Sequence, residues 1–364
     1  MTWVSRLRHF VSALTARAKT KRMLLAELDS KLERGNADPE LRSMVAYFER
    51  ERLFDRTSRM WVRLLALHVD RLMQYGPDDF YHHIGKNYCL RFTDLERVSP
   101  DLLSALSDVE IPAAQLMQRQ RNLTRTQSII YNVVALAMLK HYEHLADPER
   151  VRALRRVDPR LVQDGLALPS GVVISQDALQ SLIEIAAIES FVCLDGATVL
   201  EVGAGYGRIP YALMSTARIR RYVIVDIPPA LYVSQYFLSN VFPEKAIFRF
   251  RPFADYDEVK EEYEAADIAF LMPDQMELLP AKSVDLVVAI NCFQEMVDRE
   301  ITRYFDEFDR LSRYLYLKAS ENPQNVYSER FLALRDYPFK ADWKCLERRA
   351  CLAPSDYSEV VYEV

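Results

Sequence analysis

The sequence predicts an α/β fold over residues 173–364, preceded by a mainly helical region over residues 1–172. After about residue 175, short apolar runs alternate with helical segments, which is typical of a mostly parallel sheet with helices on both faces. Before about residue 150, apolar residues recur at helical spacing. We therefore expect the helical region to form a cap or substrate-binding part against a sheet-containing domain.

The composition indicates a folded protein. Half of the 364 residues are hydrophobic and 27% are charged, which excludes a disordered chain. The five cysteines are far apart and form no CxxC pair, so neither a disulfide framework nor a metal site is expected. The longest nearly apolar run, Ile129–Leu139, is too short to cross a membrane. These features suit a reducing compartment, and we expect a cytoplasmic protein.

Charge differs between the two halves of the chain. Residues 1–170 hold 27 Lys and Arg against 21 Asp and Glu, whereas residues 171–364 hold 20 against 31. The acidic second half argues against nucleic acid as a partner, because neutralising phosphates needs a basic surface.

The first 26 residues have the pattern of a basic amphipathic helix. They contain six Lys and Arg and no acidic residue, and apolar residues recur at three-and-four spacing from Trp3 to Leu14. Three interpretations stay open: a helix docked on the body of the protein, a helix on a membrane surface, and a transit peptide. The second would give the protein a peripheral membrane contact.

In the helical region, Met44–Leu67 and Ser128–Leu145 have the clearest helical periodicity. Residues 76–96 are irregular and rich in tyrosine and histidine, so they could line a pocket or simply connect two helices. Residues 146–174 contain several prolines and glycines and indicate a linker.

From residue 176 onward, helices and strands are expected in alternation. Strands are predicted from short, mostly apolar runs at 197–202, 222–225, 246–250, 268–272, 284–290 and 314–317. Residues 343–351 and 357–364 could close the sheet as two final strands. The helices are predicted at 176–191, from 208 to about 217, after the Pro228-Pro229 pair, and at 258–266, 297–311 and 325–334.

The glycines concentrate at one point of this pattern. The chain has only 9 glycines, where an average composition of about 7% would give roughly 25, and Gly203, Gly205 and Gly207 fall within five residues. They follow a predicted strand and open a helix, so the backbone can turn sharply and a ligand can approach it. The next strand ends at Asp226, whose carboxylate can accept hydrogen bonds from both ribose hydroxyls. The turn and this acid predict a cofactor of the adenosine type.

The residues of the turn favour S-adenosylmethionine (SAM) over NAD. Dinucleotide folds prefer GxGxxG, but the last position here is Arg208. Glu201, two residues before the first glycine, would repel a pyrophosphate but can hold the ammonium group of SAM. Tyr314 and Lys318 match the YxxxK pair of reductases, but they lie on a predicted strand and not on a helix, so we interpret the match as chance.

Several stretches resemble the sugar O-methyltransferase family of class I SAM-dependent enzymes, which have a Rossmann-like fold. These stretches are Ile174–Asp177, Glu201–Arg208, Val225–Gln235, Leu271–Pro280 and Phe293–Met296. The glycine turn and Asp226 mark class I methyltransferases as a whole, whereas the stretch DIPPALYVSQ is the part that indicates this subgroup. The resemblance is weak over the N-terminal half.

The resemblance implies roles for matching residues around the turn. Gly203 and Gly205 would face the methionine part of SAM, with Gly207 in the same turn. Asp226 would hold the ribose, and Ile227 would flank the adenine.

It also implies roles after the third and fourth strands of the domain. Asp274 or Gln275 would meet the adenine amine. Asn291 and Cys292 would line the floor near the methyl group, although ordinary packing at a strand end is the alternative.

Methyl transfer to a hydroxyl needs a general base, and the sequence offers two sources. All six histidines precede the sheet region, so a histidine base would have to come from the helical region, where His82 and His83 lie in the irregular loop. Glu295 follows the fourth strand and is the other candidate. Surface or core positions for the histidines, and capping of the following helix by Glu295, are the structural alternatives.

We therefore predict a SAM-dependent O-methyltransferase that acts on a sugar hydroxyl in the biosynthesis of polysaccharides or glycosylated metabolites, without a metal. Its partner would be a sugar or glycoconjugate. The alternatives are an NAD-linked oxidoreductase or epimerase, and a non-catalytic partner subunit with the same fold.

Overall fold

The computed structural model describes residues 21–34, 37–85, 88–89, 91–107, 109–146, 148–154, 165–168, 171, 173–321 and 332–364. The basic segment before residue 21 lies outside these ranges, so all three interpretations of it stay predictions. Part of the linker predicted over 146–174 and most of the helix predicted over 325–334 lie outside them as well.

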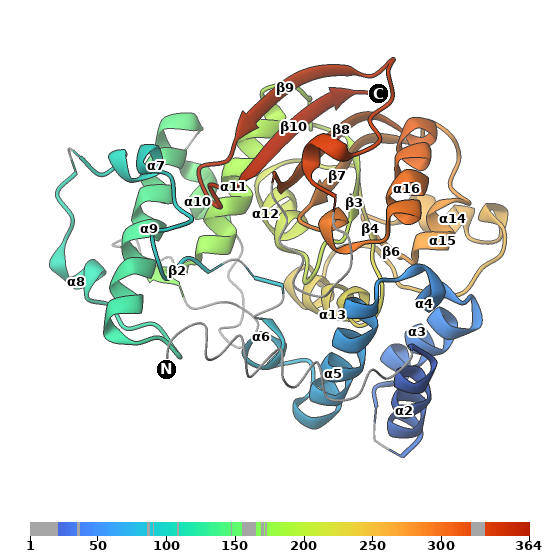
Figure 1. The fold of residues 1–364 in the computed structure, drawn as a ribbon. Coiled ribbons are helices and arrows are strands. Elements are labelled where there is room, and N and C mark those ends of the chain that lie inside the picture. The colour runs from blue at the N-terminus through green and yellow to red at the C-terminus, as the bar shows by residue number, and fades with distance from the viewer. Residues whose placement is uncertain are drawn as a thin grey trace.

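Within the described residues, an eight-stranded sheet has the strand order β5-β6-β4-β3-β7-β8-β10-β9 (Figure 1). Its strands are β3 (Thr198–Val202), β4 (Arg221–Val225), β5 (Ile247–Phe248), β6 (Ile268–Leu271), β7 (Val284–Ile290), β8 (Ser312–Ser320), β9 (Lys344–Ala350) and β10 (Tyr357–Glu363). Each matches a predicted run, although β5 is shorter and β8 longer than predicted. The α/β class with a mostly parallel, Rossmann-like sheet is confirmed.

The sheet reverses its winding at β3. The first six strands pair in parallel, and β10 is antiparallel to both β8 and β9. With the short edge strand β5 left out and the other strands numbered along the chain from β3, the order β6-β4-β3-β7-β8 is the 3-2-1-4-5 order of a doubly wound sheet. Later strands add to β4 on one side of β3 and to β7 on the other. A ligand crevice is expected at this switch point, outside the carboxyl ends of the strands.

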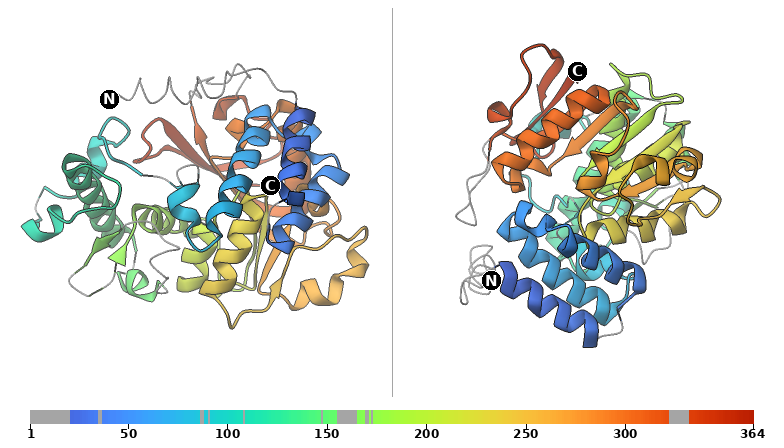
Figure 2. Two further views of the ribbon diagram at one scale, coloured as in Figure 1. Left: turned by 90° about the horizontal axis from the view of Figure 1, so that it is seen from below. Right: turned by 90° about the vertical axis from the view of Figure 1, so that its right-hand side faces the viewer.

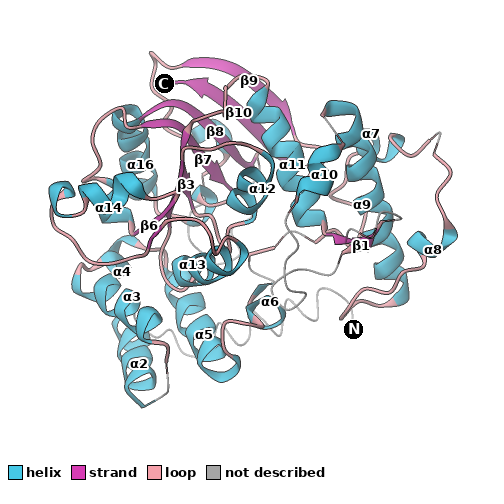
Figure 3. Cartoon of the chain, turned by 180° about the vertical axis from the view of Figure 1, so that it is seen from behind, coloured by secondary structure: helices cyan, strands magenta, loops and turns pink. Residues whose placement is uncertain are grey.

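Two helical layers cover the sheet, because alternate strand residues face opposite sides. Val199 and Tyr222 belong to the apolar core beneath one layer, and Leu200 and Val223 to the core beneath the other. The first layer, seen in Figure 3, consists of α11 (Gln176–Glu189), α12 (Arg208–Thr216) and α13 (Ala230–Val241). The second contains α14 (Lys260–Ala265) and α16 (Asp298–Leu311), and a short helix, α15 (Pro273–Met276), follows β6.

The N-terminal region is helical, as predicted, and its core is continuous with the first layer. Its helices are α2 (Lys21–Arg34), α3 (Pro39–Arg50), α4 (Leu53–Arg56), α5 (Arg59–Tyr75), α6 (Phe80–His83), α7 (Pro100–Ser104), α8 (Ala113–Leu116), α9 (Arg125–Leu145) and α10 (Glu149–Ala153). Helix α9 packs against α11, whereas α2 to α5 lie together beside the sheet domain (Figure 2). A short hairpin of β1 (Leu166–Ala167) and β2 (Val173–Ile174) spans the predicted boundary at residue 172.

The segment predicted as one helix over Met44–Leu67 is broken twice. Arg52 adopts a left-handed conformation with φ of 56°, which ends α3 and starts α4. Ser58 then caps α5, because its Oγ accepts a hydrogen bond from the backbone N–H of Trp61 at 3.4 Å. The periodicity of apolar residues continues across these breaks, so periodicity alone could not locate them.

Helices α3 and α4 dock on α15 and α16, the helices that follow β6 and β7. The Tyr47 hydroxyl donates to Asp274 Oδ2 at 2.6 Å, and Arg56 Nε donates to Glu300 Oε2 at 3.0 Å. Docking of this kind places α4 and the start of α5 above the switch point. None of the helices that the structure describes is long and apolar enough to cross a membrane.

Candidate functional site

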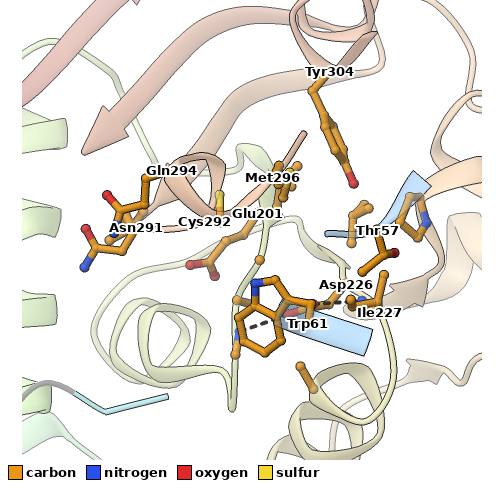
Figure 4. Close-up of a pocket in the computed structure, with 18 of the residues that line it drawn as sticks. Thr57, Trp61, Glu201, Asp226, Ile227, Asn291, Cys292, Gln294, Met296 and Tyr304 are labelled. Atoms are coloured by element: carbon orange, nitrogen blue, oxygen red, sulfur yellow. Dashed lines mark hydrogen bonds between the residues drawn. The ribbon is translucent and has the colours of Figure 1, made fainter. Parts of the chain in front are cut away.

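A cavity of about 320 Å³ lies at the switch point of the sheet (Figure 4). Its volume falls at the lower end of the range of about 300–1,000 Å³ that is usual for small-molecule sites. One wall comes from the ends of β3, β4 and β7, and the other from α4, α5 and Tyr88 of the N-terminal region. The predicted site residues that line it are Glu201, Gly203, Gly205, Asp226, Ile227, Asn291 and Cys292.

The glycine turn needs glycine for two separate reasons. Gly203, Gly205 and Gly207 have φ values of 74°, 62° and 94°, in the left-handed region that side chains disfavour. A Cβ on Gly203 would also lie 2.5 Å from the Cβ of Cys292. Gly207 does not line the cavity, because it forms the N-cap position of α12. The turn therefore brings backbone close to both the cavity and the loop after β7.

Asp226, at the end of β4, is held by the turn itself. Its Oδ2 accepts from the Gly205 backbone N–H at 3.1 Å, and its Oδ1 accepts from the Ile227 N–H at 2.8 Å. Burial raises the pKa of Asp226 to about 7, against the effect of these two hydrogen bonds. The carboxyl group is thus fixed in place and ready to accept hydrogen bonds from a ligand.

Glu201 is buried on β3, two residues before the first glycine of the turn. Its Oε2 accepts from the Tyr222 hydroxyl at 2.8 Å. Burial raises the pKa of Glu201 to about 8, although the Tyr222 hydrogen bond and the charge of Arg208 lower it. A nearby cation would lower the pKa of this carboxyl group, because its charge would offset the cost of ionising a buried carboxylate.

Arg208 occupies the position of the third glycine of a dinucleotide turn, and it is part of a buried ion cluster. Its Nη1 donates to Glu184 Oε2 at 2.6 Å and to Ser181 Oγ at 2.9 Å. Glu184 also accepts from Lys318 Nζ at 2.9 Å. Tyr314 and Lys318 both lie on β8, as predicted, and the Lys318 ammonium is used in this cluster.

Asn291 lies at the end of β7 with an unusual backbone and an unsatisfied side chain. Its φ is 58°, in the left-handed region, and such a conformation clusters at ligand sites. Its Oδ1 is buried without a hydrogen-bond partner in the described structure. A ligand with a donor group in the cavity would satisfy this oxygen.

Asp274 and Gln275 differ from their predicted role, because neither lines the cavity. Tyr47 donates to Asp274, as described above, so this carboxylate holds the N-terminal helices. Gln275 is buried, accepts from the Met272 N–H at 2.9 Å and donates to the Arg251 carbonyl at 2.8 Å. Both side chains stabilise the loop after β6, and the neighbouring Pro273 reaches the cavity in their place.

His82 and His83 also lie away from the cavity. The His83 ring stacks on Tyr75, with the ring centroids 3.7 Å apart, and its Nε2 lies 3.2 Å from Asp79. His82 Nε2 is 3.5 Å from the same aspartate. The His83 ring thus lies against α5, and both rings approach Asp79 at the start of α6, so the structure does not support either histidine as the base.

Glu295 belongs to a single turn of 3₁₀ helix, η3 (Phe293–Glu295). Its neighbours Gln294 and Met296 line the cavity, but the Glu295 side chain lies outside the described part of the structure. Its role as a base stays a prediction.

The structure adds residues that the sequence did not single out. From the N-terminal region, Thr57, Ser58, Trp61 and Tyr88 line the cavity, and from the C-terminal part Gln294, Tyr304 and Tyr357 do so. Figure 4 shows Trp61 and Thr57 facing the residues at the ends of β3, β4 and β7. No local pattern marks Thr57, Ser58 and Trp61, because only the docking of α4 and α5 brings them to the site. Tyr88 belongs to the irregular stretch 76–96, for which lining a pocket was one of the two expected roles. The described residues contain no cluster of His, Cys, Asp and Glu that could hold a metal ion.

No family model matches the chain, and a search of curated proteins gives no match. Solved structures do match it. A SAM-dependent methyltransferase from Aquifex aeolicus is 13% identical with a TM-score of 0.31, over 62% of this chain and 98% of that one. A protein of the NADB-Rossmann superfamily from Streptococcus agalactiae is 12% identical with a TM-score of 0.33, over 53% and 69%. Phosphoethanolamine N-methyltransferase 1 from Haemonchus contortus is 15% identical with a TM-score of 0.33, over 63% and 49%. Likenesses this distant carry no argument about activity, so a function has to rest on the cavity itself.

Proposed function

We propose that this protein is a SAM-dependent methyltransferase that methylates a sugar hydroxyl. The observation that carries the proposal is one cavity in which a glycine turn, Asp226 and Glu201 meet at the switch point of the sheet. When bound, SAM would supply an electrophilic methyl group. Asp226 would accept from its ribose hydroxyls, and Glu201 would lie near its ammonium group.

The charges around the turn favour SAM over a dinucleotide. A pyrophosphate at this turn would approach the buried carboxyl group of Glu201 and further disfavour its ionised form, whereas a cation there would favour that form. The Arg208 side chain, the nearest cation at the start of α12, is already paired with Glu184. A cationic ligand without phosphates avoids both problems. The strand beside β8 also differs: here it is the antiparallel β10, whereas the dinucleotide-binding sheet has a sixth parallel strand at this position.

The opposite end of the cavity favours a neutral, hydroxyl-rich acceptor. Asn291 offers its unsatisfied amide oxygen, and Gln294 Nε2 donates to the Tyr357 hydroxyl at 2.8 Å. Arg56 and Arg208, the arginines among the described lining residues, are both ion-paired with carboxylates. A phosphorylated or polyanionic acceptor such as RNA would have to compete with these pairs.

Calorimetry tests the cofactor. SAM or its demethylated product should bind, and NAD should show no measurable binding. Asp226→Ala should weaken SAM binding by about 1–3 kcal/mol, because polar partners lose their hydrogen bonds. Asp255→Ala is the matched control, since Asp255 also accepts from a backbone N–H, that of Asp257 at 2.9 Å, but lies outside the cavity. Tighter binding of NAD than of SAM would contradict the proposal.

Transfer of a labelled methyl group from SAM tests the acceptor. We expect label in nucleotide-activated sugars or oligosaccharides and none in RNA. Label in RNA alone would overturn the sugar assignment while leaving the SAM site intact.

A further inference from the structure

The described carboxylates of the cavity are already engaged. Glu201 accepts from a tyrosine hydroxyl, and Asp226 accepts from two backbone amides. Glu300 is paired with Arg56. A hydroxyl acceptor loses its proton as its oxygen is methylated, and because Glu201 and Asp226 are assigned to the proposed cofactor, another cavity group is the better candidate to receive that proton.

Tyr88 is a cavity residue whose hydroxyl is linked to a histidine. Its Oη lies 3.0 Å from Nδ1 of His68, within hydrogen-bond distance. His68 belongs to α5 and is 1% exposed, so its ring is screened from solvent. Although His68 does not itself line the cavity, it connects to it through Tyr88.

The Tyr88 ring is held directly over the glycine turn. A Cβ built on Gly205 would lie 3.3 Å from the ring, and the ring stacks on Trp61 with centroids 6.3 Å apart. The Tyr88 backbone N–H donates to the Gly85 carbonyl at 3.0 Å. These contacts fix the phenol on the side of the cavity that faces the methionine end of the proposed cofactor site.

From this geometry we propose that Tyr88 is the catalytic residue that receives the proton of the acceptor hydroxyl, and that His68 acts through it by taking the Tyr88 proton. The inference rests on the proposed methyl transfer. It assigns the proton transfer to the N-terminal region, but to a different histidine from the two predicted.

Atoms and charge are conserved in the proposed step. The acceptor oxygen bonds to the methyl carbon, and the carbon–sulfur bond breaks to leave a neutral thioether. The acceptor proton moves to Tyr88 Oη while the Tyr88 proton moves to His68 Nδ1. The positive charge of the sulfonium is thereby replaced by that of the imidazolium.

Two conservative variants test the pair. Tyr88→Phe keeps the ring against Gly205 but removes the hydroxyl, and His68→Gln keeps a hydrogen-bonding group but no basic nitrogen. Each should lower kcat by about 10²–10⁴-fold and change the Kd for SAM less than twofold. The matched controls are Tyr256→Phe, whose hydroxyl bonds to Glu264 outside the cavity, and His83→Ala. Both controls should keep the wild-type kcat.

Nitrogen NMR of the free protein gives a readout that does not depend on turnover. Nδ1 of His68 should be unprotonated and accept from Tyr88, and its shift should change in Tyr88→Phe. A protonated Nδ1 in the neutral ring, or wild-type kcat in Tyr88→Phe, overturns the inference even if methyl transfer is established. Wild-type protein that binds no SAM instead overturns the proposed function, and the NMR result still decides whether the pair exists.

Discussion

The carboxyl group of Glu201 is buried beneath the glycine turn, where burial raises its pKa to about 8. The ordinary value is 4.5, so the folded protein binds a proton that the unfolded chain releases between about pH 4.5 and pH 8. The stability of the cofactor-free protein therefore decreases as the pH rises through this window. The ionised Glu201 thus destabilises the cofactor-free fold, whereas a bound cationic ligand would pair with its charge.

Replacing Glu201 distinguishes its effect on the stability of the fold from its effect on SAM binding. Glu201→Gln should raise the Tm of the free protein at pH 8 by at least about 2–4 °C, the shift that 1 kcal/mol produces in a domain of this size class, and by much less at pH 5. The same variant should bind SAM more weakly, because the ammonium group loses its counter-charge. Thermal melts at both pH values and calorimetry check this. A Tm that rises equally at both pH values would show that ionisation of Glu201 is not the cause.

At the scale of elements, α5 links the helical region to the cavity. Its N-terminal cap, Ser58, lines the cavity, and Trp61 follows one turn later. The start of the helix therefore sets the position of a cavity wall. By contrast, Ser99 caps α7 by accepting from the Asp101 N–H at 3.2 Å and does not line the cavity.

These two caps give a matched pair of variants. Ser58→Ala and Ser99→Ala should each lower the free energy of unfolding by about 0.5–2 kcal/mol, the usual effect of losing such a cap. Only Ser58→Ala should also weaken SAM binding, since it loosens the wall formed by α5. Chemical denaturation and calorimetry measure the two effects. Equal SAM affinity in both variants would mean that α5 does not shape the cofactor site.

At the scale of the whole molecule, one buried cluster joins three elements. Glu184 of α11 binds Arg208 of α12 and Lys318 of β8. Although burial alone would raise the pKa of Glu184, the two cations hold it below its ordinary value. The cluster therefore connects the start of α12, next to the glycine turn, to β8, two strands away from β3.

Removing the central charge should be costly, because it leaves two buried cations without compensation. Glu184→Gln should lower the free energy of unfolding by about 3–5 kcal/mol, as measured by denaturant titration. Glu189→Gln on the same helix is the control. Glu189 pairs with Arg150 near the surface, so its loss should cost about 0–1 kcal/mol. A similar small loss in both variants would show that the buried cluster adds nothing specific to folding.

The sequence by itself determined the strands of the sheet and the residues at the centre of the proposed cofactor site. Buried parallel strands are nearly continuous apolar runs, so a run such as 284–290, which is apolar except for Asp285, could be recognised locally. The glycine turn was also recognisable, because its left-handed backbone conformation disfavours other residues at Gly203 and Gly205. Asp226 and Glu201 follow from their spacing to that turn, since a short strand or turn fixes where each side chain lies.

Only the tertiary structure decided which distant residues complete the site and which do not. Tyr88 reaches the glycine turn, and Tyr47 binds Asp274, across more than a hundred residues of sequence. No local pattern encodes such contacts, because they depend on how the docked helices lie against the sheet. Packing within the helical region, of α6 and the residues after it on α5, leaves His83 stacked on Tyr75 outside the cavity and places the buried His68 beside Tyr88 at the cavity.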